Sequence, residues 1–297
     1  SMLATDMVVK QKNGEDWKIN VDDVEEVFFE EKANIPDDST VVDTSETFLR
    51  FNILSDSTVE VTRESNDDLT YIGHDTITIP EKVRIDGKIY TVKSIGRCAF
   101  GGCVSVTNIN IPKSVTDIGE LAFSDCLSLT SIEIPEGVTS IGEYAFSDCS
   151  SLASIDIPES VTSIGWYAFN GCSGLTSINI PKDVKEIGYS AFKGCSSLTS
   201  IQIPEGLTSI EGSVFSGCNS LITLQIPESV TNIGQYAFMD CSGLTSINIP
   251  KSVTNIGYSA FSGCRSLASI DIPESVTSIG NIAFNNCSNL DVVIDNL

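Results

Sequence analysis

Residues 126–146, CLSLTSIEIPEGVTSIGEYAF, are one unit of a repeat that decides the fold of this 297-residue chain. The unit returns every 23 residues without an insertion or a deletion. Its regular residues are Phe100, Phe123, Phe146, Phe169, Phe192, Phe215, Phe238, Phe261 and Phe284, Cys103, Cys126, Cys149, Cys172, Cys195, Cys218, Cys241, Cys264 and Cys287, and the prolines from Pro112 to Pro273. Because a fixed period of this length is typical of stacked repeats, the sequence predicts a solenoid of nine 23-residue repeats.

Polar and apolar residues alternate in the first part of the unit. Leu129, Ile132 and Ile134 are expected to point inward, and Ser131 and Glu133 outward, as in a short half-buried strand. In the second part, the apolar residues are three and four positions apart, which suits a second short extended piece and then a tight turn or a single helical turn. The residues of this second part are Val138, Ile141, Ala145, Phe146 and Cys149.

Proline and glycine mark the ends of the two expected strands. A proline has no N–H for a strand ladder, so Pro135 and its equivalents are expected to end the first strand. A glycine after the second strand would allow a positive φ or a close approach between turns. These glycines are Gly96, Gly119, Gly142, Gly165, Gly188, Gly234, Gly257 and Gly280. Glu211 stands at the equivalent position of one turn, where either glycine is not needed or the turn is locally strained.

The stretch SLTSIEIPEGVTSIGEYAFSDC (128–149) resembles the BspA-like type of leucine-rich repeat, and the resemblance covers roughly residues 90–290. It implies a β-rich leucine-rich-repeat solenoid of short parallel strands. Members of this family are mostly secreted or surface-anchored bacterial proteins linked to adhesion to host proteins and cells. The resemblance therefore implies an extracellular or cell-surface location for this chain.

The region before the repeats resembles the β-rich N-terminal cap of the same family. FLRFNILSDSTVEV (48–61) has the pattern of two strands, TITIP (76–80) that of another, and VRI and KIYTV around Asp86 and Gly87 that of a short hairpin. We divide the chain into an acidic N-terminal segment (1–45), the cap (46–92) and the solenoid (93–297). VDDVEEVFFEEK (21–32) suits a short helix or an acidic strand, and residues 1–16 suit a disordered acidic lead-in.

The composition argues against several partners and locations. With 17 basic and 40 acidic residues, the chain would repel nucleic acid and anionic membrane surfaces. No apolar stretch approaches the roughly 18 residues of a membrane helix. Ser1 and Met2 have the character of an expression remnant with no secretory signal after them, so we expect any signal peptide to be missing from this chain.

The residue types that carry catalysis or bind metals are poorly represented. Nine cysteines share one repeat position, where parallel side chains cannot form disulfides, so they are expected to be free and buried. The spacing of Cys98 and Cys103 is a weak indication of a disulfide bond or of a pair of metal ligands. The single histidine, His74, is expected to be solvated in a loop, and it leaves few ways to activate a nucleophile. We predict no catalytic residues, no metal, no cofactor and no enzyme activity.

Two surfaces are candidates for binding. The first is the outward side of the first strands, with the rows Asn110, Glu133, Asp156, Asn179, Gln202, Gln225, Asn248 and Asp271, and Asn108, Ser131, Ser154, Ser177, Ser200, Thr223, Ser246 and Ser269. The second is an aromatic flank, Tyr144, Trp166, Tyr167, Tyr189, Tyr236 and Tyr258, where the rings either bind a partner or cover the neighbouring turn. The charged row after each proline, with Lys113, Glu136 and Glu159, is interpreted as a feature for solubility and register.

These surfaces favour a secreted or cell-surface protein-binding or adhesion module. Its expected partner is a protein, such as a host extracellular or cell-surface protein, with a glycan as a further candidate. The alternative is a passive stalk or spacer without a ligand of its own. A third hypothesis is a glycan-active enzyme using Glu133 and Asp156, since glycosidases need two carboxylates about 5–9 Å apart.

Overall fold

The computed structural model describes the chain except residues 1–6, 11–15, 20–39, 64–70, 72 and 295–297. It divides into two compact units, 1–39 and 40–297. In the first unit, β1 (Met7–Lys10) and β2 (Asp16–Ile19) form an antiparallel hairpin. The expectation of a disordered lead-in over 1–16 is therefore wrong for Met7–Lys10. The segment 21–32, expected as helix or strand, lies outside the described residues.

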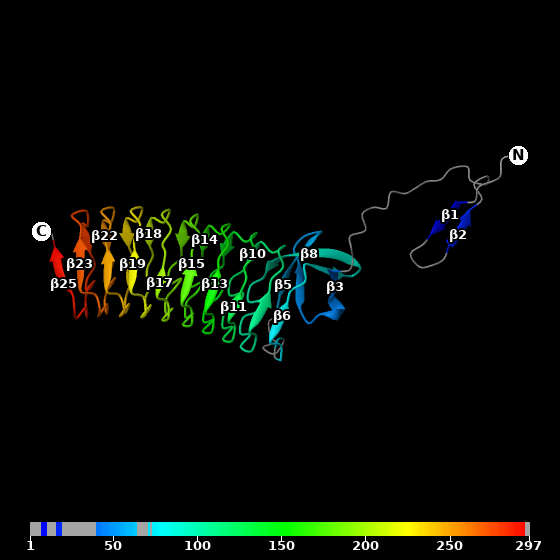
Figure 1. Cartoon of the computed structure of the whole chain (residues 1–297), viewed down its shortest axis with the longest axis horizontal. Coiled ribbons are helices and arrows are strands. Elements are labelled where there is room, and N and C mark those ends of the chain that lie inside the picture. Colours follow the sequence, from blue (N-terminus) through cyan, green and yellow to red (C-terminus); the bar gives the residue numbers. More distant parts are fainter. Residues whose placement is uncertain (1–6, 11–15, 20–39, 64–70, 72, 295–297) are drawn as a thin grey trace. The chain divides into compact units, whose positions relative to one another are not determined.

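The second unit begins with a cap of strands before the first turn of the solenoid (Figure 1). Its elements are β3 (Val41–Asp43), the 3-10 helix η3 (Thr44–Glu46), β4 (Arg50–Ile53), β5 (Thr58–Thr62), β7 (Lys82–Ile85) and β8 (Lys88–Ile95). β4 pairs with β5 and β7 with β8 as antiparallel hairpins, and Asp86 and Gly87 have φ values of 50° and 80° at the second turn. This confirms the predicted strands and the predicted short hairpin. β3 pairs with β7, and β5 pairs with β8, so the cap is tied to the first solenoid turn.

Each solenoid turn contributes two short strands, most of which pair in parallel with the equivalent strands of the neighbouring turns (Figure 1). The first strands are β6 (Thr76–Thr78), β9 (Asn108–Asn110), β11 (Ser131–Ile132), β13 (Ser154–Asp156), β15 (Ser177–Asn179), β17 (Ser200–Ile201), β19 (Thr223–Gln225), β21 (Ser246–Asn248), β23 (Ser269–Ile272) and β25 (Asp291–Ile294). The second strands are the end of β8, β10 (Asp117–Ile118), β12 (Ser140–Ile141), β14 (Ser163–Ile164), β16 (Glu186–Ile187), β18 (Ser209–Ile210), β20 (Asn232–Ile233), β22 (Asn255–Ile256) and β24 (Ser278–Ile279). Among the strands from β9 to β24, each paired residue lies opposite the residue at the same repeat position in the neighbouring turn, as Ser131 lies opposite Asn108. The predicted solenoid of short parallel strands is confirmed.

Phenylalanine and cysteine line one continuous interior. Ring centroids of successive phenylalanines lie 5.1–5.9 Å apart from Phe100 to Phe284, with the ring planes nearly parallel. The cysteines are free thiols, and those from Cys103 to Cys264 are buried. Each thiol from Cys126 onward donates to the carbonyl oxygen of a phenylalanine in the preceding turn, with Sγ–O distances of 3.0–3.2 Å. The predicted row of buried thiols is confirmed, and this hydrogen bond explains why cysteine suits the position better than a purely apolar residue.

Glycine after the second strand is required by close approach between turns. A Cβ atom at Gly165 would lie 2.7 Å from the backbone nitrogen of Glu143, and a Cβ at Gly257 would lie 2.5 Å from that of Gln235. The positive φ falls elsewhere, two residues later, where Tyr167 has a φ of 56°. Between the second strand and the cysteine the backbone forms hydrogen-bonded turns, so of the two alternatives for this segment the tight turn is correct.

Candidate functional site

The outward side of the first strands is an exposed polar surface, which we call the first strand face. Every residue of the row from Asn110 to Asp271 is exposed, and in the neighbouring row only Asn108 is partly covered. The isoleucines between them, such as Ile132 and Ile155, are buried. The alternation expected from the sequence is therefore confirmed, and it holds the polar side chains at regular spacing on a fixed backbone.

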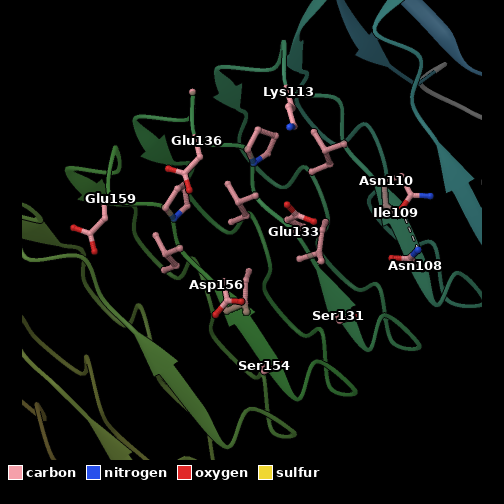
Figure 2. A pocket seen from close by; sticks show the side chains of 18 residues that line it. Asn108, Ile109, Asn110, Lys113, Ser131, Glu133, Glu136, Ser154, Asp156 and Glu159 are labelled. Carbon is pink, nitrogen blue, oxygen red and sulfur yellow. Dashed lines mark hydrogen bonds between the residues drawn. The ribbon is translucent and has the colours of Figure 1, made fainter. Parts of the chain in front are cut away.

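The first strand face is hollowed near the cap, and Figure 2 shows this hollow at close range. It has a volume of about 750 Å³. The polar side chains of β9, β11 and β13 form its floor, together with Glu133, which follows β11. The backbones of Glu133 and Asp156 are joined by a parallel β-bridge, so the two carboxylates are neighbours. The loops after each proline line one side, where Lys113, Glu136 and Glu159 follow one another (Figure 2).

The hollow continues along the face toward the C-terminal turns. A second part of about 570 Å³ is lined by β13, β15, β17 and β19 and by Glu205. Its polar side chains are mainly hydroxyls and amides, including Asn179, Gln202 and Gln225. The two parts share Ser154 and Asp156, so the face carries one long groove, which we call the strand-face groove.

The strand-face groove is most acidic near the cap, and its second part has fewer carboxylates, those of Asp156 and Glu205. Near the cap, Glu133, Asp156, Glu136 and Glu159 face a single lysine, Lys113. Among the described residues, none of these charged side chains forms an ion pair, and they remain available to a bound partner. Carboxylates accept hydrogen bonds from lysine and arginine, whereas amides both donate and accept. The groove is thus suited to an extended polar ligand with basic groups at one end.

Threonine side chains stiffen the backbone beside the groove. Thr130 and Thr176 each donate from Oγ1 to a backbone carbonyl of the preceding turn, at 3.3 and 3.2 Å. The same bond recurs at Thr199 and Thr245. Because these bonds join adjacent turns, they fix the spacing of the groove residues, and a fixed spacing lowers the entropy cost of binding.

The aromatic flank lies on the turns after the second strands, and it is divided into two groups. Tyr144 and Tyr167 stack with centroids 4.6 Å apart, and Tyr189 lies 5.7 Å from Tyr167. The second group is Tyr236 and Tyr258, at 5.3 Å edge to face. The structure therefore does not bring all the predicted aromatic residues together, because serine and glycine interrupt the row at 212–213.

Within the aromatic flank, Trp166 and Tyr258 have the largest exposed fractions, 58% and 41%. The Trp166 indole also lies against the next turn, since a Cβ atom at Gly188 would meet its Cδ1 at 2.5 Å. Tyr189 covers Gly212 in the same way, and its hydroxyl is 3.2 Å from Ser213 Oγ. Packing between turns is thus part of the role of these rings, and more than half of the Trp166 surface remains exposed.

Several other predicted residues are placed differently from the expectation. His74 is half-buried and its ring stacks on Phe48 at 4.1 Å, so it is not simply solvated. Cys98 is partly exposed, and both it and Cys103 are free thiols, so the weak indication of a disulfide bond between them is wrong. In the described part of the chain, no three His, Cys, Asp or Glu side chains gather as a metal would require.

No described helix has the length and apolar character to cross a membrane.

Sequence reasoning missed two features of this surface. The row of Lys113, Glu136 and Glu159 was interpreted as a feature for solubility, but it forms a side of the groove. Its position depends on how the chain turns after each proline, which the repeat pattern does not specify. Val104 and Leu127 are exposed apolar residues at the same position in adjacent turns. The sequence carried a signal for them, because all later turns have a polar residue there, in most cases serine.

The repeat region matches a known family. Residues 81–195 and 162–291 match the sequence profile of the BspA type leucine rich repeat region, with six copies. A leucine-rich repeat protein from Bacteroides ovatus is 35% identical, with a TM-score of 0.69 over 82% of this chain and 69% of that one. One from Eubacterium ventriosum is 24% identical, with a TM-score of 0.55 over 75% and 66%.

A leucine rich cell surface protein from Faecalibacterium prausnitzii is 30% identical over 83% of this chain and 86% of that one, with a TM-score of 0.41. No curated protein sequence matches the chain.

Proposed function

Because the chain belongs to the BspA-type leucine-rich repeat family, we propose that it is a secreted or cell-surface module that binds a macromolecular partner along the strand-face groove. The partner that fits best is a protein whose extended segment carries lysine or arginine at one end. Repeat folds serve many functions, so the proposal depends on the groove and not on the fold alone.

The observation that carries the proposal is the continuous strand-face groove itself. Its two parts, of about 750 and 570 Å³, run over six adjacent first strands without interruption by a bulky side chain. A ligand lying along it would make many weak contacts to amides, hydroxyls and carboxylates. Contacts of this kind add up to a useful affinity when the groups are already held in place.

Trp166 supports a second point of contact. Tryptophan is among the residues that most often carry binding energy at protein interfaces, and this one keeps 58% of its side chain exposed. We propose that a large partner contacts the aromatic flank as well as the groove. Such a contact would be apolar and would depend little on salt, unlike the contacts at the acidic end of the groove.

The test is binding to a panel of purified extracellular-matrix proteins, mucin and polysaccharides, measured by biolayer interferometry. We expect saturable binding to a protein of the panel. Glu133→Lys with Asp156→Lys should weaken it about tenfold or more, because two carboxylates on the groove floor are reversed. The control is Asp117→Lys with Glu186→Lys, the same charge change at exposed positions of the second strands.

The outcomes separate the hypotheses. Equal loss in both double variants would show that net charge alone governs binding, which contradicts a groove site. Loss with Trp166→Ala alone would place the contact on the aromatic flank. Saturable binding to a polysaccharide alone would replace the protein partner with a glycan. No binding to any of the panel would favour the passive stalk.

A further inference from the structure

Both strand ladders of the solenoid are interrupted between the turn of Phe192 and the turn of Phe215. β14 pairs with β16 and β18 with β20, but β16 and β18 belong to different sheets. On the other side, β17 and β19 also belong to different sheets, as do β11 and β13, which are still joined by one bridge between Glu133 and Asp156. The backbone N–H of Glu211 donates to no carbonyl of the preceding turn, whereas that of the equivalent Gly234 donates to Ile210 at 2.7 Å. The two turns are therefore joined by fewer backbone hydrogen bonds than their neighbours.

Glu211 is the cause that the geometry identifies. It stands where most other turns have the glycine after the second strand. At Gly188 and Gly234, an added Cβ atom would lie 2.6 Å from a backbone nitrogen of the preceding turn, which no real Cβ tolerates. The Cβ of Glu211 must therefore be accommodated by moving its turn away from the preceding one.

The distances around Glu211 agree with this displacement. The centroids of Phe192 and Phe215 are 5.9 Å apart, the widest step in the phenylalanine stack, whose other steps are 5.1–5.6 Å. The turn bond from Val214 N to Glu211 O is 3.5 Å, whereas its equivalents in other turns measure 3.1–3.3 Å. A cleft of about 680 Å³ lies beside the joint, lined by residues of both turns that include Ile187, Leu207 and Glu211.

Other turns separate the loss of the glycine from the loss of a serine bridge. In the turn of Gly137, which keeps Gly142, the N–H groups of Thr139 and Gly142 also donate to no carbonyl of the preceding turn, so the missing bonds alone do not identify Glu211 as the cause. Ser160 and Ser229 each bridge to a carbonyl of the preceding turn at 2.6 Å. Gly137, Asp183 and Gly206 take the place of this serine in their turns. The turn of Asp183 still keeps two paired residues in its second-strand ladder, and that of Gly137 keeps one. Of the three, only the turn of Gly206 also lacks the glycine after the second strand, and only there does this ladder end.

We propose that the Glu211 side chain acts as a wedge that makes this joint a hinge, so that the turns on either side bend and open against each other there. The groove crosses the joint, because its second part is lined by Gln202 on one side and Gln225 on the other. Bending at the hinge changes the distance between these two side chains, and thereby the curvature that the groove offers. The hinge does not depend on what the groove binds.

The test is hydrogen–deuterium exchange, read by mass spectrometry, on the whole chain and two variants. In the wild type, the amides of Thr208 and Glu211 should exchange about a hundredfold faster than those of Thr231 and Gly234, which are bonded to the preceding turn. Glu211→Gly should slow exchange at positions 208 and 211 to the level of Thr139 and Gly142, whose turn has the glycine, also lacks the serine and keeps one paired residue in its ladder. Glu211→Ala keeps the Cβ atom and should leave exchange as in the wild type.

A second readout measures the hinge and not only the missing bonds. Exchange at rising urea should show that the turns before and after the joint lose protection at different concentrations in the wild type and in Glu211→Ala. In Glu211→Gly they should lose it together. The proposal is overturned if Glu211→Gly leaves both readouts unchanged, and equally if Glu211→Ala closes the joint, since the carboxylate and not the Cβ would then hold it open.

Discussion

The protein is expected to lose most of its stability when the pH rises from about 7 to about 10. Burial raises the pKa of Cys218 and of Cys264 to about 12, and that of Cys195 and Cys241 well above the ordinary value of 9.0. Burial also raises the pKa of Cys172. The unfolded chain therefore releases thiol protons in a pH range where the folded chain keeps them.

The direction of the pH effect follows from this difference between the thiol pKa values of the folded and the unfolded chain. Because the folded-state pKa values are raised, the stabilisation is complete below about pH 9 and is lost as the pH rises toward the folded values. At one pH unit above the unfolded value, each such thiol costs the folded state about 1.4 kcal/mol, and five thiols cost about 7 kcal/mol. That is comparable to the whole stability of many domains. Urea unfolding midpoints at several pH values measure the effect.

Matched variants separate the thiols from other groups that titrate in alkali. Cys195→Ala with Cys218→Ala should reduce the pH dependence by about two protons per molecule, although it lowers stability at neutral pH. Ser229→Ala removes a bond of 2.6 Å to the Leu207 carbonyl and should lower stability without altering the pH dependence. An unchanged pH dependence in the cysteine double variant would contradict the assignment to buried thiols.

Replacing Phe169 by alanine is expected to destabilise the protein by about 3–5 kcal/mol. The ring is fully buried and stacks at 5.4 Å on both Phe146 and Phe192, so its loss leaves a cavity that neither neighbour fills. Phe284 is the matched control, because it is half-buried and stacks on Phe261. Phe284→Ala should cost only about 1–2 kcal/mol. Equal urea midpoints for the two variants would show that the interior is not a continuous stack.

The sequence predicted the strands and the interior because the period fixes which side chains are equivalent. Once Leu129 and Ile132 are assigned to the interior of one turn, the same assignment holds for all the others, and Pro135 fixes where the strand stops. The cap strands were predicted by local alternation and by Asp86–Gly87, whose positive φ values suit a tight hairpin. These are local signals that do not need knowledge of distant contacts.

Other features could not be predicted, for physical reasons. The φ of 56° at Tyr167 is imposed by contacts between turns, since tyrosine itself disfavours this region. The groove depends on the direction in which the loop of Lys113 leaves its strand. The sequence marked Glu211 as exceptional, but it left open whether glycine is needed there. That need depends on the distance between the backbones of adjacent turns, which the sequence does not give.

Alkylation of the native protein with iodoacetamide shows whether one continuous interior contains the cysteine row. Peptide mass spectrometry then gives the modification of each cysteine. Cys98, which is partly exposed, should react, and the half-buried Cys287 should react more slowly. The eight cysteines from Cys103 to Cys264 should react only after unfolding. Comparable modification of these eight in the folded protein would show that they do not lie in a closed, continuous interior.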